Sequence, residues 1–110
     1  MVITEDQVQE AFDRLRFGGK NAAQARANRI YLTEYRKVMK SEGMKKHLSQ
    51  PLAAQEREAY ASEEYKAHLL AMKEAIEQDE ACTWQMVRAR AVIEAWRTAS
   101  ANQRGETQIG

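Results

Sequence analysis

The sequence predicts an all-α fold: a helical hairpin or bundle with a long, coiled-coil-like C-terminal helix, completed by oligomerisation. The 110 residues include only five Gly and one Pro, so strands joined by tight turns would have few places to turn. Apolar residues recur at helical spacing through most of the chain. Hydrophobic residues make up 44% and charged residues 30%, which is too apolar for a disordered chain and too charged for a membrane span.

The first 20 residues predict a short helix followed by a Gly-Gly turn. Thr4 and Gln7 have the spacing of a capping box, and Gly18 is expected to end the helix. We expect a single helical domain over residues 1–110. Its core helices fall within 21–100, and residues 101–110 form a frayed tail.

Three further helices are predicted in the core region. Asn21 is a candidate N-cap for the second helix, and Gly43 and Pro51 bracket an expected break. The segment PLAAQEREAY is helical in composition. Ser62 is expected to cap a last helix that runs to about Ser100, because no Gly or Pro interrupts that stretch.

The last helix carries a stripe of apolar residues close to heptad spacing, which predicts an oligomer or core seam. Asp79 interrupts this stripe, either as a polar device that sets register or as a slightly exposed turn, and helix continuity through it stays open. A second stripe beside it (Trp84, Val87, Ala91, Ala95) implies a second neighbour, within the chain or in an oligomer. The seam residues are Tyr65, Leu69, Met72, Ile76, Met86, Ile93 and Trp96.

Charge is strongly segregated although the net charge is only +1. Residues 14–46 carry ten bases and two acids, whereas residues 47–82 carry eight acids and three bases. Two interpretations follow. The basic stretch pairs with the acidic one, within the chain or between subunits, or it forms a patch that binds phosphate.

The second helix is predicted to carry basic residues on one face and apolar residues on the opposite face. Five bases (Arg26, Arg29, Arg36, Lys37 and Lys40) fall within an arc of roughly 100° at helical periodicity. On the opposite side lie Ala27, Tyr31, Tyr35 and Val38. The two tyrosines could stack on bases, but on the face away from the charges we expect them to be core residues. A basic stripe backed by an apolar face is typical of a protein that follows a phosphate backbone.

The sequence does not favour catalysis. It has no glycine-rich phosphate loop and no metal-ligand spacing, so we expect a protein that is not an enzyme and uses no cofactor. His47 and His68 have no pairing signature, and Cys82 is expected to be a small buried hydrophobe. One cysteine and an acidic N-terminal segment without signal-peptide character lead us to expect a cytoplasmic protein.

Three segments resemble a known family in order and spacing. NRIYLTEYRKVMKSEGMKK, AAQEREAYASEEYKAHL and TWQMVRARAVIEAWR are similar to the UvsY type of recombination mediator, a small helical accessory protein of phage recombination operons. The resemblance covers about residues 21–100. It implies an oligomeric ring that binds single-stranded DNA and helps to load a recombinase against a single-strand-binding protein, in the host-cell cytoplasm.

The resemblance also implies contact residues. LAAQEREAYAS is similar to the family's DNA-contacting segment, with Arg57 and Tyr60 where the motif has an arginine and a tyrosine, and Gln55 where it has a lysine. Because Gln55 replaces that lysine, we expect the basic stripe on the second helix to take over the contact from this segment. The predicted DNA-binding set is Arg26, Arg29, Arg36, Lys37, Lys40, Lys45, Lys46, Arg57 and Tyr60.

The alternative function is a phage-encoded protein-interaction module, for example an inhibitor of a host nuclease or defence complex. The two hypotheses differ in where the bases of the second helix point. A DNA-binding protein needs them exposed and contiguous across subunits, whereas an interaction protein can bury them in salt bridges with the acids from Glu56 to Glu64.

Overall fold

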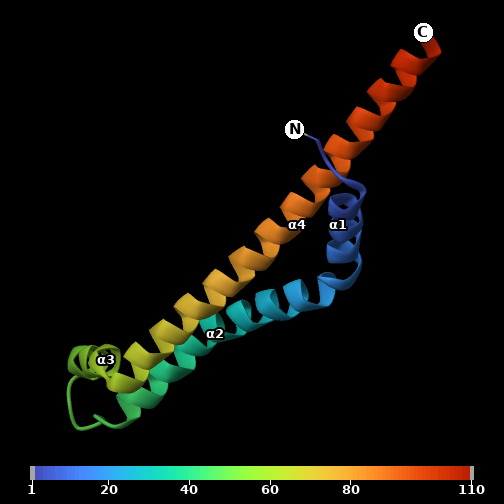
Figure 1. Cartoon of the computed structure of the whole chain (residues 1–110). Coiled ribbons are helices and arrows are strands. Elements are labelled where there is room, and N and C mark those ends of the chain that lie inside the picture. The colour runs from blue at the N-terminus through green and yellow to red at the C-terminus, as the bar shows by residue number, and fades with distance from the viewer. Residues whose placement is uncertain (1, 110) are drawn as a thin grey trace. The chain divides into compact units, whose positions relative to one another are not determined.

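The computed structural model describes residues 2–109, and these fold into four helices with no strand in that range. The helices are α1 (Glu5–Phe17), α2 (Gly19–Lys45), α3 (Leu52–Ala61) and α4 (Glu63–Ile109) (Figure 1). The predicted all-α class with a long C-terminal helix is therefore confirmed. Nothing is stated for the side chains of residues 107–109.

Local signals explain where α1 begins and ends. The backbone N–H of Gln7 donates to Thr4 Oγ1 at 3.2 Å, and the backbone N–H of Thr4 donates to Gln7 Oε1 at 2.9 Å. This is the predicted capping box, and it satisfies backbone donors that a helix start leaves unpaired. At the other end the N–H of Gly18 bonds to the carbonyl of Arg14 at 2.8 Å.

The break expected between Gly43 and Pro51 is confirmed, because α2 ends at Lys45 and α3 begins at Leu52. The start of α2 differs from the sequence expectation. The helix begins at Gly19, so Asn21 lies inside it and is not its cap. It also continues through Gly43 to Lys45. Gly43 is buried against α3, where a Cβ built on it would lie 2.8 Å from the Cβ of Ala59 and 2.9 Å from its Cα. The missing side chain therefore permits a close approach of two helices rather than a break.

One residue separates α3 from α4. Ser62 has an extended backbone, and its Oγ accepts a hydrogen bond from the N–H of Tyr65 at 3.1 Å. The predicted cap is confirmed, and α4 then runs without interruption to Ile109. It passes through Asp79 and beyond the end expected near Ser100. Of the predicted frayed tail, Gly110 lies outside the described residues.

The helices form two compact units. Unit 1 comprises residues 1–23 and 80–110, and unit 2 comprises residues 24–79. In unit 1, α1 lies beside the second half of α4 (Figure 1) and buries Ala11 against Ala89 and Ile93, with Leu15 and Val92 packed around them. Since α2 and α4 run through both units, the expectation of a single domain stays a prediction.

Unit 2 is an antiparallel hairpin of α2 and the first half of α4, with α3 at its turn (Figure 1). The packed side of α2 carries Ala25, Arg29, Leu32 and Gly43, none of which is exposed. Tyr31 and Val38 lie away from this side and are exposed, and Tyr31 retains 62% of its accessible surface. Tyr35 lies at the edge of the packed side, where its ring is near that of His68, and is also exposed. The prediction that the tyrosines are core residues was therefore wrong within the chain. On the packed side of α2, small residues allow α4 to approach closely.

The packed face of α4 follows a regular 3-4 spacing and includes five of the seven predicted seam residues, Tyr65, Met72, Met86, Ile93 and Trp96. The other two lie off this face. Leu69 and Ile76 remain 45% and 41% exposed, and His68 and Ala75 are buried in their place. The second predicted stripe, which includes Trp84 and Val87, is also exposed within the chain. The buried or half-buried positions that follow this spacing are Tyr65, His68, Met72, Ala75, Asp79, Cys82, Met86, Ala89, Ile93 and Trp96.

Candidate nucleic-acid interface

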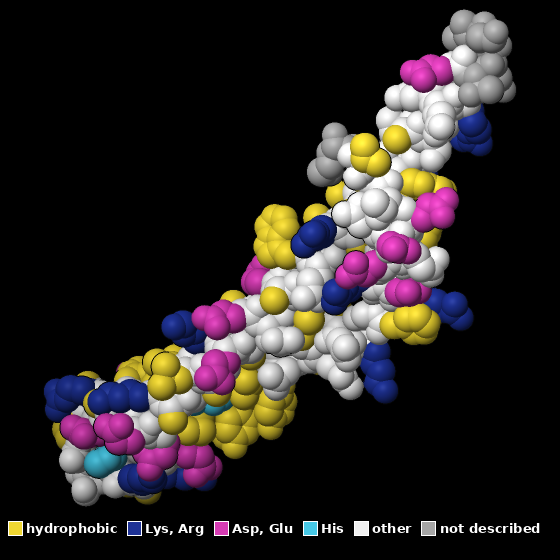
Figure 2. Space-filling view, in the orientation of Figure 1, with side chains coloured by type: hydrophobic (Ala, Val, Ile, Leu, Met, Phe, Trp, Pro, Cys, Tyr) yellow, Lys and Arg dark blue, Asp and Glu magenta, His cyan; other side chains and the backbone are white. Residues whose placement is uncertain are grey.

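The nine residues predicted to contact DNA all lie in unit 2, on α2, on the turn after it and on α3. Seven of the nine are exposed; Arg29 and Lys40 are half-buried. Figure 2 shows Lys and Arg side chains interspersed with Asp and Glu around the end of the chain that carries α3. The surface there has mixed charge and is not uniformly basic.

Three of the predicted bases pair with acids that lie far along the chain. Arg29 Nη1 lies 3.1 Å from Asp79 Oδ2, Lys40 Nζ lies 3.3 Å from Glu56 Oε1, and Lys46 Nζ lies 3.4 Å from Glu64 Oε1. Each pair joins the basic segment 14–46 to the acidic segment 47–82. The interpretation that these segments pair within the chain is confirmed for these three contacts.

The Arg29–Asp79 pair is the most buried of the three. Asp79 is only 7% exposed, at a seam position of α4, and about a third of the Arg29 side chain is exposed. A carboxylate so deep in a helix interface requires a charged or hydrogen-bonding partner, and Arg29 supplies one. Of the two possibilities for Asp79, the exposed turn is excluded, and the residue is a paired polar group within the seam.

Lys40 lies between an acid and an aromatic ring. Its Nζ is 5.3 Å from the centroid of the Tyr60 ring, and Tyr60 packs edge-on against Tyr65 with centroids 5.1 Å apart. Hydrogen bonding to Tyr60 and then to Glu56 raises the pKa of Lys40. The charged form of this lysine is therefore favoured, but its charge is partly directed to neighbours in the same unit.

The remaining cations are available to a ligand. Lys37 and Lys45 pair only with Glu34 and Glu42 on their own helix, as exposed contacts of 3.0 and 3.6 Å, and such surface pairs contribute about 0.3–0.5 kcal/mol. Arg26, Arg36 and Arg57 are exposed and make no ion pair with a carboxylate in the part of the chain that the structure describes. These three guanidinium groups are the strongest candidates for phosphate contact.

Tyr31 and Tyr35 form an exposed aromatic pair on α2. Their rings stack with centroids 5.7 Å apart, and the Tyr35 ring lies 5.9 Å from the His68 ring. His68 Nε2 lies 2.6 Å from the carbonyl oxygen of Leu32. Because a carbonyl only accepts, Nε2 carries the proton and donates it. Hydrophobic side chains gather on this part of α2 in Figure 2.

Metal binding and membrane spanning were the two further possibilities for the described residues. Residues 2–109 hold no group of three or more His, Cys, Asp or Glu side chains placed to bind a metal. None of the described helices is both long and apolar enough to cross a bilayer. Cys82 is buried, as the sequence predicted.

Comparisons with protein families, with curated proteins and with solved structures gave no match, so the interpretation of this surface rests on the geometry of the chain.

Proposed function

We propose that this chain is a non-catalytic DNA-recombination accessory protein that binds single-stranded DNA and assists recombinase loading. The observation that carries the proposal is the set of three exposed arginines on α2 and α3 (Arg26, Arg36 and Arg57) that have no carboxylate partner among the described residues. Lys37 and Lys45 add cations whose surface pairs a phosphate can displace at small cost. The recombinase and the single-strand-binding protein enter only through the resemblance to recombination mediators.

Self-association is part of this proposal. Unit 2 buries Ala25, Ala59, Tyr65 and Ala75 as its apolar residues, and no large side chain in the described chain is completely buried. Large apolar residues such as Tyr31, Leu69 and Ile76 are exposed instead. A homo-oligomer would cover them and would present several weak sites to one strand, which raises the overall affinity through effective concentration.

The test is a fluorescence-anisotropy titration of a labelled thirty-nucleotide poly-dT strand at about 50 and 200 mM salt, with a duplex as control. We expect binding that weakens steeply with salt and favours the single strand. Replacing Arg26, Arg36 and Arg57 by Gln is expected to reduce the slope of log K against log salt by about 2, at roughly 0.7 for each phosphate contact.

A matched triple variant separates the effect of where the positive charges lie from the effect of how many there are. Arg16, Arg90 and Arg104 are exposed and lie in unit 1, so replacing them by Gln removes the same charge elsewhere. This control is expected to retain most of the affinity. Equal loss in both triple variants would mean that net charge alone governs binding, and unchanged affinity in the first would exclude the assigned site.

The second candidate function is a protein-interaction module, such as a phage-encoded inhibitor of a host nuclease or defence complex. The pairing of Lys40 with Glu56 and of Lys46 with Glu64 favours it, because these contacts use charge that a DNA-binding surface would leave open. Absence of strand binding even at the lower salt concentration would select this alternative over the mediator.

A further inference from the structure

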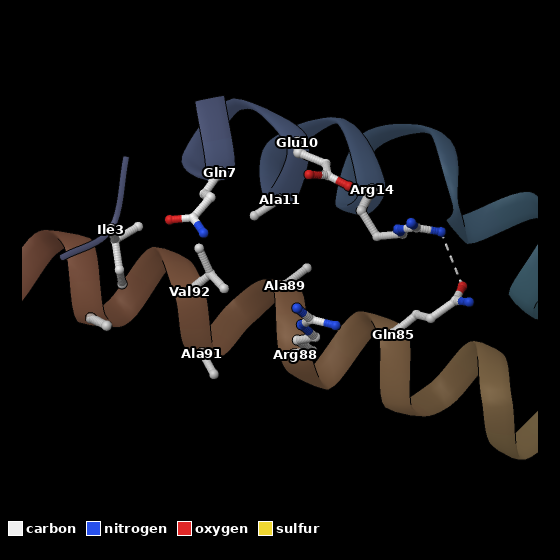
Figure 3. A pocket seen from close by; sticks show the side chains of 11 residues that line it. Ile3, Gln7, Glu10, Ala11, Arg14, Gln85, Arg88, Ala89, Ala91 and Val92 are labelled. Atoms are coloured by element: carbon white, nitrogen blue, oxygen red, sulfur yellow. Dashed lines mark hydrogen bonds between the residues drawn. The ribbon is translucent and has the colours of Figure 1, made fainter. Parts of the chain in front are cut away.

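A groove of about 650 Å³ lies between α1 and the second half of α4, entirely within unit 1 (Figure 3). Small apolar residues from both helices line it, including Ala11, Ala89 and Val92. Because these side chains are short, the two helices leave space between them that their own side chains do not fill. An apolar group of a ligand would lose water-exposed surface by entering it.

The two ends of the groove differ in chemistry. Figure 3 shows Ile3, Val92 and the uncharged amide of Gln7 toward one end, and the charged Arg14 with Gln85 at the other. A ligand that fits both ends has an apolar part and a polar part at a fixed separation. The difference between the two ends therefore determines which way round a ligand binds, as well as which chemical groups it must carry.

Arginines enter the lining from both helices. Arg14 of α1 reaches toward α4 and donates from Nη1 to Gln85 Oε1 at 3.1 Å, which is a neutral partner (Figure 3). Arg88 of α4 makes no ion pair with a carboxylate in residues 2–109. Glu10 is the single acid in the lining, so the lining carries a net positive charge. Two guanidinium groups without ionic partners favour a carboxylate ligand.

We infer that this groove binds a short acidic and apolar peptide segment of a partner protein. An apolar side chain of the segment packs on Ala11, Ala89 and Val92, and its carboxylates accept hydrogen bonds from Arg14 and Arg88. Glu10 opposes any anion, so the discrimination comes from the apolar floor. A nucleic-acid strand fits less well, because its phosphates gain nothing from that floor. This site is separate from the arginines of unit 2 and does not depend on the proposed DNA binding.

The probe is a fluorescein-labelled hexapeptide with three leucines followed by three glutamates, titrated with the full-length chain. The comparison peptide has glutamines in place of the glutamates and an amidated end. We expect the acidic peptide to bind at least about tenfold more tightly, because charge-assisted hydrogen bonds contribute more than neutral ones. Equal affinity for the two peptides, or no binding of the acidic one, would overturn the assignment.

Two variants locate the binding on the chain. Replacing both Arg14 and Arg88 by Gln is expected to lower the affinity for the acidic peptide by about tenfold or more. Arg90 is exposed and lies outside the groove lining, so Arg90→Gln is expected to leave that affinity unchanged. Ala95→Leu fills the groove from an exposed position, and Ala99→Leu is its exposed control outside the lining. Loss of peptide affinity in Ala95→Leu but not in Ala99→Leu would support binding in the groove. Equal effects in the two variants would place the peptide elsewhere.

Competition distinguishes this proposal from the proposed function. The double arginine variant is expected to bind the poly-dT strand as the unaltered chain does, and excess strand is expected not to displace the peptide. Displacement by the strand would identify the groove as a nucleic-acid site and would overturn the peptide assignment. Failure of DNA binding by the unaltered chain leaves the peptide result intact.

Discussion

The interactions that stabilise the inside of unit 1 differ from those that stabilise the inside of unit 2. In unit 1, Ala11, Ala89 and Ile93 form an apolar cluster between α1 and α4. In unit 2, the hairpin of α2 and α4 contains a buried ion pair, Arg29 with Asp79, and a close contact between Gly43 and Ala59. Unit 1 therefore depends mainly on apolar burial. Unit 2 combines charge pairing with close backbone approach.

This difference shows how a short helical chain can position functional side chains with little apolar core. In unit 2, small residues at the interface let the helices approach closely, and the long side chains are left at the surface. That leaves both the tyrosine pair and the unpaired arginines available to a partner. In unit 1, the same use of alanine leaves a groove between the helices.

The largest expected effect is on the apolar cluster of unit 1. Ile93→Ala removes a side chain that is only 5% exposed and is expected to cost about 3 kcal/mol in the free energy of unfolding. Hydrogen exchange by mass spectrometry should show the loss of protection in α1 and the second half of α4. Val87→Ala is the exposed control on the same helix, and it should change stability by less than about 0.5 kcal/mol.

The next effect is on the ion pair of unit 2. Asp79→Ala is expected to destabilise by about 2 kcal/mol, below the full cost of breaking a buried pair because a third of Arg29 remains exposed. Urea denaturation followed by circular dichroism measures this. Replacing both Arg29 and Asp79 by Leu should recover much of the loss, since no charge is then left in the seam. A double variant less stable than Asp79→Ala would contradict this account.

Gly43→Ala tests the close contact between α2 and α3. Alanine favours a helix by about 1 kcal/mol over glycine, but overpacking against the Ala59 backbone costs about 1–3 kcal/mol. We therefore expect a net loss of about 1 kcal/mol by urea denaturation. The matched control is Gly105→Ala, also within a helix, where an added Cβ meets nothing within 4 Å. That change should be neutral or stabilising.

The smallest effect is a pH dependence at an exposed contact of unit 2. A hydrogen bond from its own backbone N–H, followed by the Lys46 ammonium, lowers the pKa of Glu64. A carboxyl group with a depressed folded pKa contributes stability above its unfolded pKa, and that contribution is lost as pH falls through the folded pKa. An NMR titration of the Glu64 side-chain carbonyl carbon should show a midpoint below that of an ordinary solvent-exposed glutamate. Lys46→Gln should raise the midpoint only in part, because the backbone bond remains.

Helix type and several helix ends could be predicted because they depend on local chemistry. The Thr4–Gln7 capping box and the Ser62 cap involve residues three apart, so the sequence alone contains both partners. The side of a helix that packs could not be predicted so well. Hydrophobicity favours Leu69 and Ile76 over His68 and Ala75, yet packing between close helices selects small or paired residues.

The candidate site illustrates the same limit. Periodicity places Arg29 and Lys40 on one face of α2 with the other bases, but it does not say which acids reach them from α3 and α4. Asp79 and Glu56 lie fifty and sixteen residues further along the chain. Gly43 resembles a helix break in sequence, and only the neighbouring Ala59 reveals the close contact.

The spacing of contacts along the chain has a consequence for the order of folding. Lys46 and Glu64 are 18 residues apart, whereas Arg14 and Gln85 are 71 apart. Closing a short loop loses less chain entropy than closing a long one, so contacts near α3 should form first and the hairpin of unit 2 should then close toward Arg29 and Asp79. Closure of unit 2 shortens the effective loop between α1 and the second half of α4. Docking of α1 is therefore expected to be the last folding step, and during synthesis it must wait until most of α4 has left the ribosome.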